Sequence, residues 1–151
     1  MPCVQRSRRH PLLRALRVDK LTYAALEATL GEHLAGRAGE AVPVLRMAGL
    51  SAEVIGARAE RLAHRLGSGG WRTEVVDGLS TIGGGSAPGS GLPTRLHALA
   101  REGLSADALD ARLRSLDPPI VGRIENDRVV LDLRTVAEAE DEEIVSALGQ
   151  L

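Results

Sequence analysis

The sequence has almost no aromatic residues: 151 residues include one Trp, one Tyr and no Phe. Hydrophobic residues still make up 44% of the chain, so its core has to be built from aliphatic side chains. Folds that bind RNA by stacking bases on several aromatic rings are therefore excluded. A chain of this length buries roughly 70% of its extended surface on folding, which is enough for one compact domain.

Cysteine and lysine each occur once. Cys3 alone cannot form an intrachain disulfide or a cysteine metal cluster, which fits a reducing compartment. A Schiff base with an aldehyde cofactor needs a lysine amine, and we expect Lys20 to be an ordinary exposed residue in the first turn of a helix. No apolar run approaches the roughly 18 residues of a membrane span. The sequence thus indicates a cytoplasmic protein with no membrane partner.

Charge is distributed unevenly along the chain. Residues 1–20 contain six Lys and Arg and one acid, whereas residues 137–151 contain five acids and no Lys or Arg. The basic start suggests a surface that faces an anion. The acids at 138–143 fall where the last helix is expected to begin, and the helix dipole favours negative charge there. We therefore expect them to form a solvated face.

Hydrophobic periodicity and capping residues predict alternating helices and strands. The expected elements are a helix after Asp19, a helix after Ser51, a strand from Trp71, a strand or irregular crossing over 92–100, a helix after Ser105, a hairpin turning at Asn126-Asp127 and a last helix with a capping box of Thr135 and Glu138. This order favours an α+β fold of two layers, with a small antiparallel or mixed sheet and helices on one face.

Two of the expected helices carry apolar stripes. The stripe after Asp19 consists of Tyr23, Leu26, Leu30 and Leu34, and the buried stripe after Ser51 consists of Ile55, Ala59, Leu62 and Leu66. Both have the three- and four-residue spacing of one helix face.

Two features of the sequence could suggest a catalytic or metal site. The glycine-rich stretch 83–91 lacks the lysine of a P-loop, and Pro88 breaks both the dinucleotide pattern and the hydrolase elbow. It remains either a plain connection or a cradle of backbone amides for an anion. The histidines at positions 10, 33, 64 and 97 have no metal-ligand spacing. We therefore predict no metal site.

Arg14 and Arg17 are the strongest candidates for a binding site. They stand three residues apart just ahead of a helix, where two guanidinium groups can point at one phosphate-like group. The alternative is a basic tail whose stems cover the neighbouring leucines. Spacing alone leaves both interpretations open.

Several stretches together resemble one known family. They are residues 10–22 (HPLLRALRVDKLT), 25–30 (ALEATL), 42–47 (VPVLRM), 83–89 (GGGSAPG), 117–125 (DPPIVGRIE) and 131–136 (LDLRTV). In this order they resemble bacterial selenocysteine synthase, the L-seryl-tRNA(Sec) selenium transferase family. The resemblance runs from about His10 to the C-terminus.

The resemblance implies a fold-type I enzyme dependent on pyridoxal 5'-phosphate. Members convert seryl-tRNA(Sec) to selenocysteinyl-tRNA(Sec) with selenophosphate, and they form large ring-like homo-oligomers. The chain would match the C-terminal part of the family. Residues 10–40 would be the return segment of the large domain with a linking helix, and 41–151 the small C-terminal α/β domain. Residues 1–9 do not resemble the family and are expected to be disordered.

The family pattern also assigns roles. Arg14 and Arg17 would face the anionic group of the selenium donor, and the cofactor lysine would lie upstream of this chain. The chain alone would then hold no pyridoxal phosphate and no catalytic residue, and would be inactive without the missing large domain. Two alternatives stay open: a fragment of a related pyridoxal-phosphate enzyme acting on a small amino compound, and a non-catalytic α+β module that binds an anion or a partner.

Overall fold

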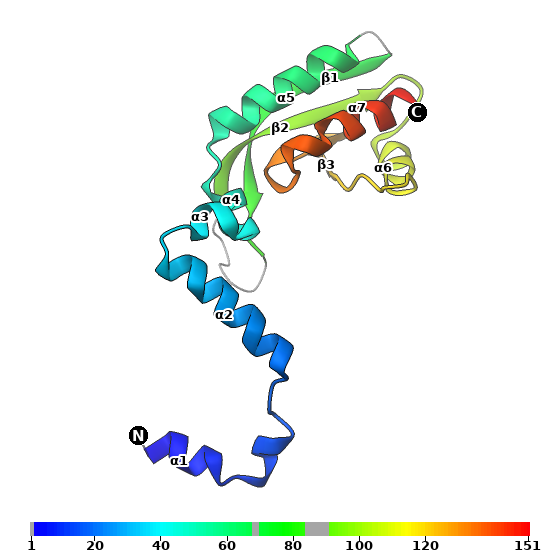
Figure 1. Cartoon of the computed structure of the whole chain (residues 1–151). Coiled ribbons are helices and arrows are strands. Elements are labelled where there is room, and N and C mark those ends of the chain that lie inside the picture. Colours follow the sequence, from blue (N-terminus) through cyan, green and yellow to red (C-terminus); the bar gives the residue numbers. More distant parts are fainter. Residues whose placement is uncertain (1, 68–69, 84–90) are drawn as a thin grey trace. The chain divides into compact units, whose positions relative to one another are not determined.

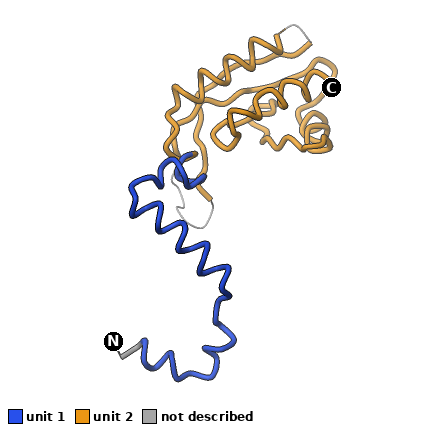
Figure 2. The backbone as a smooth tube through the Cα atoms, viewed as in Figure 1, with its two compact units in different colours: residues 1–46 blue, residues 47–151 orange. Residues whose placement is uncertain are grey.

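The computed structural model describes residues 2–67, 70–83 and 91–151. Its backbone divides into two compact units, residues 1–46 (unit 1) and residues 47–151 (unit 2), which Figure 2 shows in blue and orange. The domain boundary that the resemblance implies between residues 40 and 41 stays a prediction. Among the helices described, none is both long and apolar enough to cross a membrane.

The elements that the structure describes in unit 1 are all helices or single helical turns. They are α1 (Pro2–Arg8), the single turn η1 (Pro11–Arg14), α2 (Lys20–Leu34), α3 (Ala38–Ala41) and the first part of α4 (Pro43–Gly49). The cap predicted at Asp19 is confirmed, since its side chain accepts a hydrogen bond from the Thr22 N–H at 2.8 Å. The expected disorder of residues 1–9 differs from the structure, which has α1 there.

The apolar stripe of α2 is exposed. No residue of this helix is buried, and the exposed fraction is 53% for Leu26 and 91% for Leu34. The periodicity predicts the helix correctly, but the contacts within unit 1 do not cover its apolar face.

Unit 2 contains the sheet. Its elements are α5 (Ala52–Leu66), β1 (Trp71–Thr81), β2 (Gly91–Arg101), α6 (Ala106–Arg114), β3 (Arg123–Glu125), β4 (Arg128–Leu131), the turns η2 (Leu133–Thr135) and η3 (Glu138–Glu140), and α7 (Asp141–Gly149). The strand order is β1-β2-β4-β3 with antiparallel pairing throughout. The predicted α+β fold is confirmed, and residues 92–100 belong to a regular strand (Figure 1). Most of the glycine-rich stretch, residues 84–90, lies outside the described residues.

The main core lies between one face of the sheet and the helices α5, α6 and α7. Alternate strand residues such as Val75, Leu99 and Val129 point to this face, where they pack with the predicted stripe of α5. Figure 1 shows α5 running along β1 and β2. The predicted arrangement of helices on one face of the sheet therefore holds for the described part of unit 2.

The β3–β4 hairpin turns at the predicted dipeptide. Asn126 and Asp127 have φ angles of 50° and 60°, the left-handed conformation that a two-residue hairpin turn of type I′ requires at both positions. Asn and Asp adopt this conformation more readily than most other residues.

The other face of the sheet is bridged by arginine side chains. Arg123 on β3 donates to the carbonyl of Leu79 on β1 at 3.2 Å, and Arg128 on β4 pairs with Glu74 on β1. Beneath them lies a small second cluster of Leu96, Ala98 and Val130, all nearly fully buried. The sheet thus buries apolar residues on both faces.

Two predictions about the last helix are wrong. Thr135 and Glu138 do not form its capping box: the Thr135 hydroxyl donates to the Asp132 carbonyl, and the Ala137 N–H donates to Glu140 at 2.8 Å. The acidic stretch is also not uniformly solvated, because Asp141 is buried and pairs with Arg58 at 2.6 Å. Tertiary pairing with α5 therefore decides where these acids point.

Candidate functional site

The predicted anion-binding pair lies in unit 1. The turn η1 begins after His10, whose Nδ1 accepts from the Leu12 N–H at 3.3 Å, and Pro11 suits its first position because it has no N–H to leave unsatisfied. Arg14 is the last residue of η1, Arg17 follows three residues later, and both side chains are exposed.

The neighbouring acid Asp19 forms no ion pair with either arginine in the part of the chain that the structure describes. The Asp19 carboxylate accepts from the N–H and hydroxyl of Thr22, and these hydrogen bonds lower the pKa of Asp19. Within the described residues, neither Arg14 nor Arg17 makes an ion pair or a side-chain hydrogen bond. Both guanidinium groups are thus available to an anionic ligand. That they hold one and the same group stays a prediction.

Lys20 lies where the sequence predicts it. It is the first residue of α2 and is exposed. Reactive lysines that form Schiff bases are activated by an apolar pocket or a neighbouring cation. The structure has a hollow lined by residues of α1 and η1, and Lys20 does not line it. That Lys20 is an ordinary residue without a cofactor role stays a prediction.

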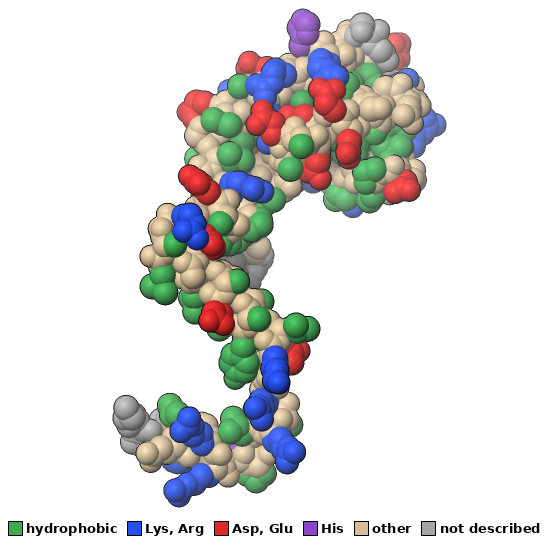
Figure 3. All heavy atoms as spheres, viewed as in Figure 1, with side chains coloured by type: hydrophobic (Ala, Val, Ile, Leu, Met, Phe, Trp, Pro, Cys, Tyr) green, Lys and Arg blue, Asp and Glu red, His purple; other side chains and the backbone are tan. Residues whose placement is uncertain are grey.

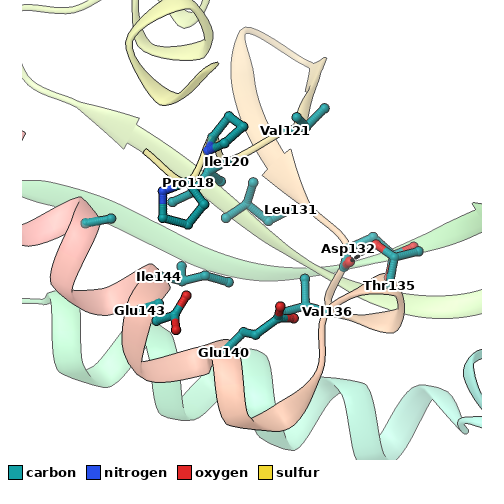
Figure 4. Close-up of a pocket in the computed structure, with 12 residues that line it drawn as sticks. Pro118, Ile120, Val121, Leu131, Asp132, Thr135, Val136, Glu140, Glu143 and Ile144 are labelled. Carbon is teal, nitrogen blue, oxygen red and sulfur yellow. Dashed lines mark hydrogen bonds between the residues drawn. The ribbon is translucent and has the colours of Figure 1, made fainter. Parts of the chain in front are cut away.

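Unit 2 contains a pocket of about 190 Å³ that the sequence analysis missed. Figure 4 shows Pro118 and Ile120 facing Ile144 of α7 across it, with Leu131 and Val136 nearby and Glu140 and Glu143 at the border. Its lining contains no Lys, Arg, His or Cys. Such a surface suits an apolar group rather than an anion, and no local sequence signal predicts it because four separate segments build it.

A buried polar cluster links β1, β2 and the turn η2. Asp132 accepts hydrogen bonds from the hydroxyls of Ser80 and Thr94 at 2.5 and 3.1 Å. Arg134 donates from Nε to Ser80, and its other nitrogens donate to the carbonyls of Leu50 and Pro93. Every charged group here already has protein partners. The charged groups of the motif at 131–136 thus stabilise the fold, whereas other residues of the same motif line the pocket described above.

The histidines do not form a site either. His10, His33 and His64 are exposed, whereas His97 on β2 is fully buried, and neither of its ring nitrogens has a hydrogen-bond partner among the residues that the structure describes. Burial lowers the pKa of His97 to about 4, so its ring is neutral at pH 7. In the described ranges, no three His, Cys, Asp or Glu side chains are grouped so that they can bind a metal ion.

These features define an α+β protein with an exposed arginine pair ahead of its first long helix. The family model of L-seryl-tRNA selenium transferase matches residues 2–137 of the chain, and the chain belongs to this family. The match extends into residues 2–9, which the sequence motifs do not cover.

Curated relatives agree with the family match. An L-seryl-tRNA(Sec) selenium transferase from Nitratidesulfovibrio vulgaris is 46% identical over 97% of this chain. The enzymes of that name from Geobacter sulfurreducens and Clostridium botulinum are 44% and 35% identical over 95% and 98% of it. The chain spans only about a third of the length of these relatives, 32% or 33%.

Proposed function

We propose that this chain is the C-terminal third of an L-seryl-tRNA(Sec) selenium transferase. In that enzyme it would take part in converting seryl-tRNA(Sec) to selenocysteinyl-tRNA(Sec) with selenophosphate. The observation that carries the proposal is the match of nearly the whole chain to relatives named for this activity. The exposed Arg14 and Arg17 support it, because they are free to bind an anionic donor.

The proposed role of Arg14 and Arg17 is to hold the anionic group of the selenium donor. A guanidinium presents paired N–H donors that match two oxygens of a phosphate-like group, and two such groups fix its orientation. The cofactor lysine and pyridoxal phosphate would come from segments outside this chain. The complete protein would act in the cytoplasm as a homo-oligomer.

A chimeric enzyme tests this proposal. This chain would replace the matching third of the Nitratidesulfovibrio vulgaris relative, and formation of selenocysteinyl-tRNA(Sec) would be measured. We expect activity, and we expect Arg14→Ala or Arg17→Ala to lower kcat/KM for selenophosphate by about 10²–10³-fold, as for other preorganised donors to anions. The matched control is Arg112→Ala, since Arg112 is exposed on α6; its effect should stay below about twofold.

An active chimera that does not respond to either substitution would contradict the role of the arginine pair. A chimera that turns over a small amino compound without tRNA would favour the related-enzyme alternative. The native protein gives a separate check, because its mass can be measured after capture with an antibody to α7. A species far heavier than 16.0 kDa agrees with a complete synthase, and a species at 16.0 kDa contradicts it and favours a binding module.

A further inference from the structure

The positive charge of this protein is concentrated in one segment of unit 1. Residues 6–20, called the basic segment here, contain five Arg and one Lys against the single acid Asp19. Arg6 and Arg8 lie on α1, Arg9 follows it, and all three are exposed. Figure 3 shows blue side chains gathered over this part of the chain. The segment is therefore a strongly positive surface.

The arginines of unit 2 are used differently. Unit 2 has eleven Arg and sixteen acids, and seven of those arginines form ion pairs. Among the described residues, no cation of the basic segment forms one, and Asp19 is engaged as a helix cap. The excess positive charge of the chain thus lies in unit 1 and is open to an external polyanion.

The composition of the basic segment indicates which anion it suits. Its cations are arginines with one exception, and guanidinium groups form paired hydrogen bonds with phosphate oxygens. The segment has no Phe, Tyr or Trp on which a base can stack, which favours recognition of the backbone over recognition of the bases. Arg6, Ser7 and His10 also border a hollow of about 480 Å³, whose remaining lining is the leucines at positions 12, 13 and 16.

We propose that Arg6, Arg8 and Arg9 bind the phosphate backbone of an RNA without regard to its sequence. This inference rests on the proposed function, because the substrate of that reaction is a tRNA. It assigns these three residues a task separate from that of Arg14 and Arg17, which would hold the selenium donor. An anionic lipid surface is the competing partner, and the test includes it.

The test measures binding of the full chain to a fluorescently labelled tRNA transcript by anisotropy over a series of salt concentrations. The variant carries Arg6→Gln, Arg8→Gln and Arg9→Gln. The control carries Arg46→Gln, Arg72→Gln and Arg112→Gln, three exposed arginines elsewhere in the chain. Both variants lose three positive charges. A loss of tRNA affinity in the basic-segment variant alone therefore reports on contacts made by its three arginines. Thermal melting checks that both remain folded.

We expect the basic-segment variant to bind at least about tenfold more weakly at about 100 mM salt. The slope of log K against log salt should become less steep by about 2 to 3, because each lost phosphate contact removes about 0.7 to 0.9. The control should change binding by less than about twofold. Replacing the same three residues by Lys should restore most of the affinity, since point charges still attract phosphates.

Equal binding by the wild type and the basic-segment variant would overturn the inference, and so would an equal loss in the control. Binding to vesicles with anionic headgroups that exceeds binding to tRNA, and depends on the same residues, would also overturn it in favour of a membrane surface. The chimera assay reports separately on the proposed function. If the chimera is active but the basic-segment variant binds tRNA as tightly as the wild type, only this inference is contradicted. If the chimera is inactive but tRNA binding depends on salt and on the basic segment, only the proposed function is contradicted.

Discussion

At the scale of single residues, the most unusual side chain is His97. It is fully buried on β2, and within the described part of the chain its neutral ring has no hydrogen-bond partner. The unpartnered ring nitrogens imply a cost to folding, because a buried polar group without a partner loses its hydration without compensation. His97 thus fills space in a core that is poor in aromatic residues, at the expense of stability in acid.

We expect this burial to make folding sensitive to pH. The folded pKa of His97 is about 4 and the model-compound value is 6.5, so the unfolded chain binds a proton below pH 6.5 that the folded chain does not. The contribution of neutral His97 to the free energy of unfolding is therefore fully present above pH 6.5 and is lost as the pH falls towards 4. The His97 contribution amounts to about 2 kcal/mol between pH 7.5 and pH 5, measurable by urea denaturation at both values.

Two variants isolate this effect. His97→Leu should reduce the loss of stability between the two pH values by about 2 kcal/mol, because the titrating group is gone. His64→Gln removes an exposed histidine and should leave the pH dependence unchanged. If the wild type and His97→Leu lose the same stability on acidification, the assigned protonation state of His97 is wrong.

At the scale of elements, the motif at 117–125 has a packing explanation. Gly122 leads into β3, and a Cβ atom at this position would lie 2.8 Å from Cγ1 of Val129 and 3.0 Å from both Cδ2 of Leu131 and the carbonyl of Val130. Val129 and Leu131 are core residues of β4. The segment can therefore approach β4 this closely only with glycine at 122.

Gly122→Ala should destabilise the protein by about 1–3 kcal/mol, since the new methyl group overpacks a well-filled core. Urea denaturation at pH 7 measures the change. Gly149→Ala is the matched control: a Cβ there meets nothing within 4 Å, and alanine is a better helix former than glycine. The packing explanation fails if both substitutions have the same small effect.

At the scale of the whole molecule, the two units differ in both charge and apolar exposure. Unit 1 has eight Lys and Arg and four acids, whereas unit 2 has an excess of acids. Unit 1 also exposes the apolar stripe of α2, together with Leu12 and Leu16 nearby. Exposed apolar surface of this extent is typical of an interaction site. This apolar exposure agrees with the finding that the chain spans only about a third of the length of its relatives.

We expect the isolated chain to associate with itself through the α2 stripe at micromolar concentrations. Replacing Leu26 and Leu30 by Gln should shift the sedimentation profile towards the monomer, because it removes the central apolar side chains of the stripe. Replacing the exposed Val54 and Val121 of unit 2 by Gln is the control and should leave the profile unchanged. A wild-type chain that stays monomeric would contradict this expectation.

Much of this structure follows from local sequence signals. The caps at Asp19, Ser51 and Ser105, and the turn at Asn126-Asp127, are confirmed because each depends on a few neighbouring residues. The order of helices and strands, and hence the α+β fold, follows from them. Spacing singles out Arg14 and Arg17 but leaves two interpretations open, and that they bind an anionic ligand stays a prediction.

Only the tertiary structure decides which polar residues are buried and which apolar ones are not. Arg58 and Asp141 form a buried ion pair across 83 residues, and no local pattern distinguishes this aspartate from the exposed acids beside it. The predicted stripes of α2 and α5 share a three- and four-residue spacing, but apolar residues are concentrated on one side of α5 and not of α2, and in the described part of unit 2 the sheet covers the stripe of α5. Periodicity specifies which side of a helix is apolar, but burial depends on surfaces brought together from distant parts of the chain.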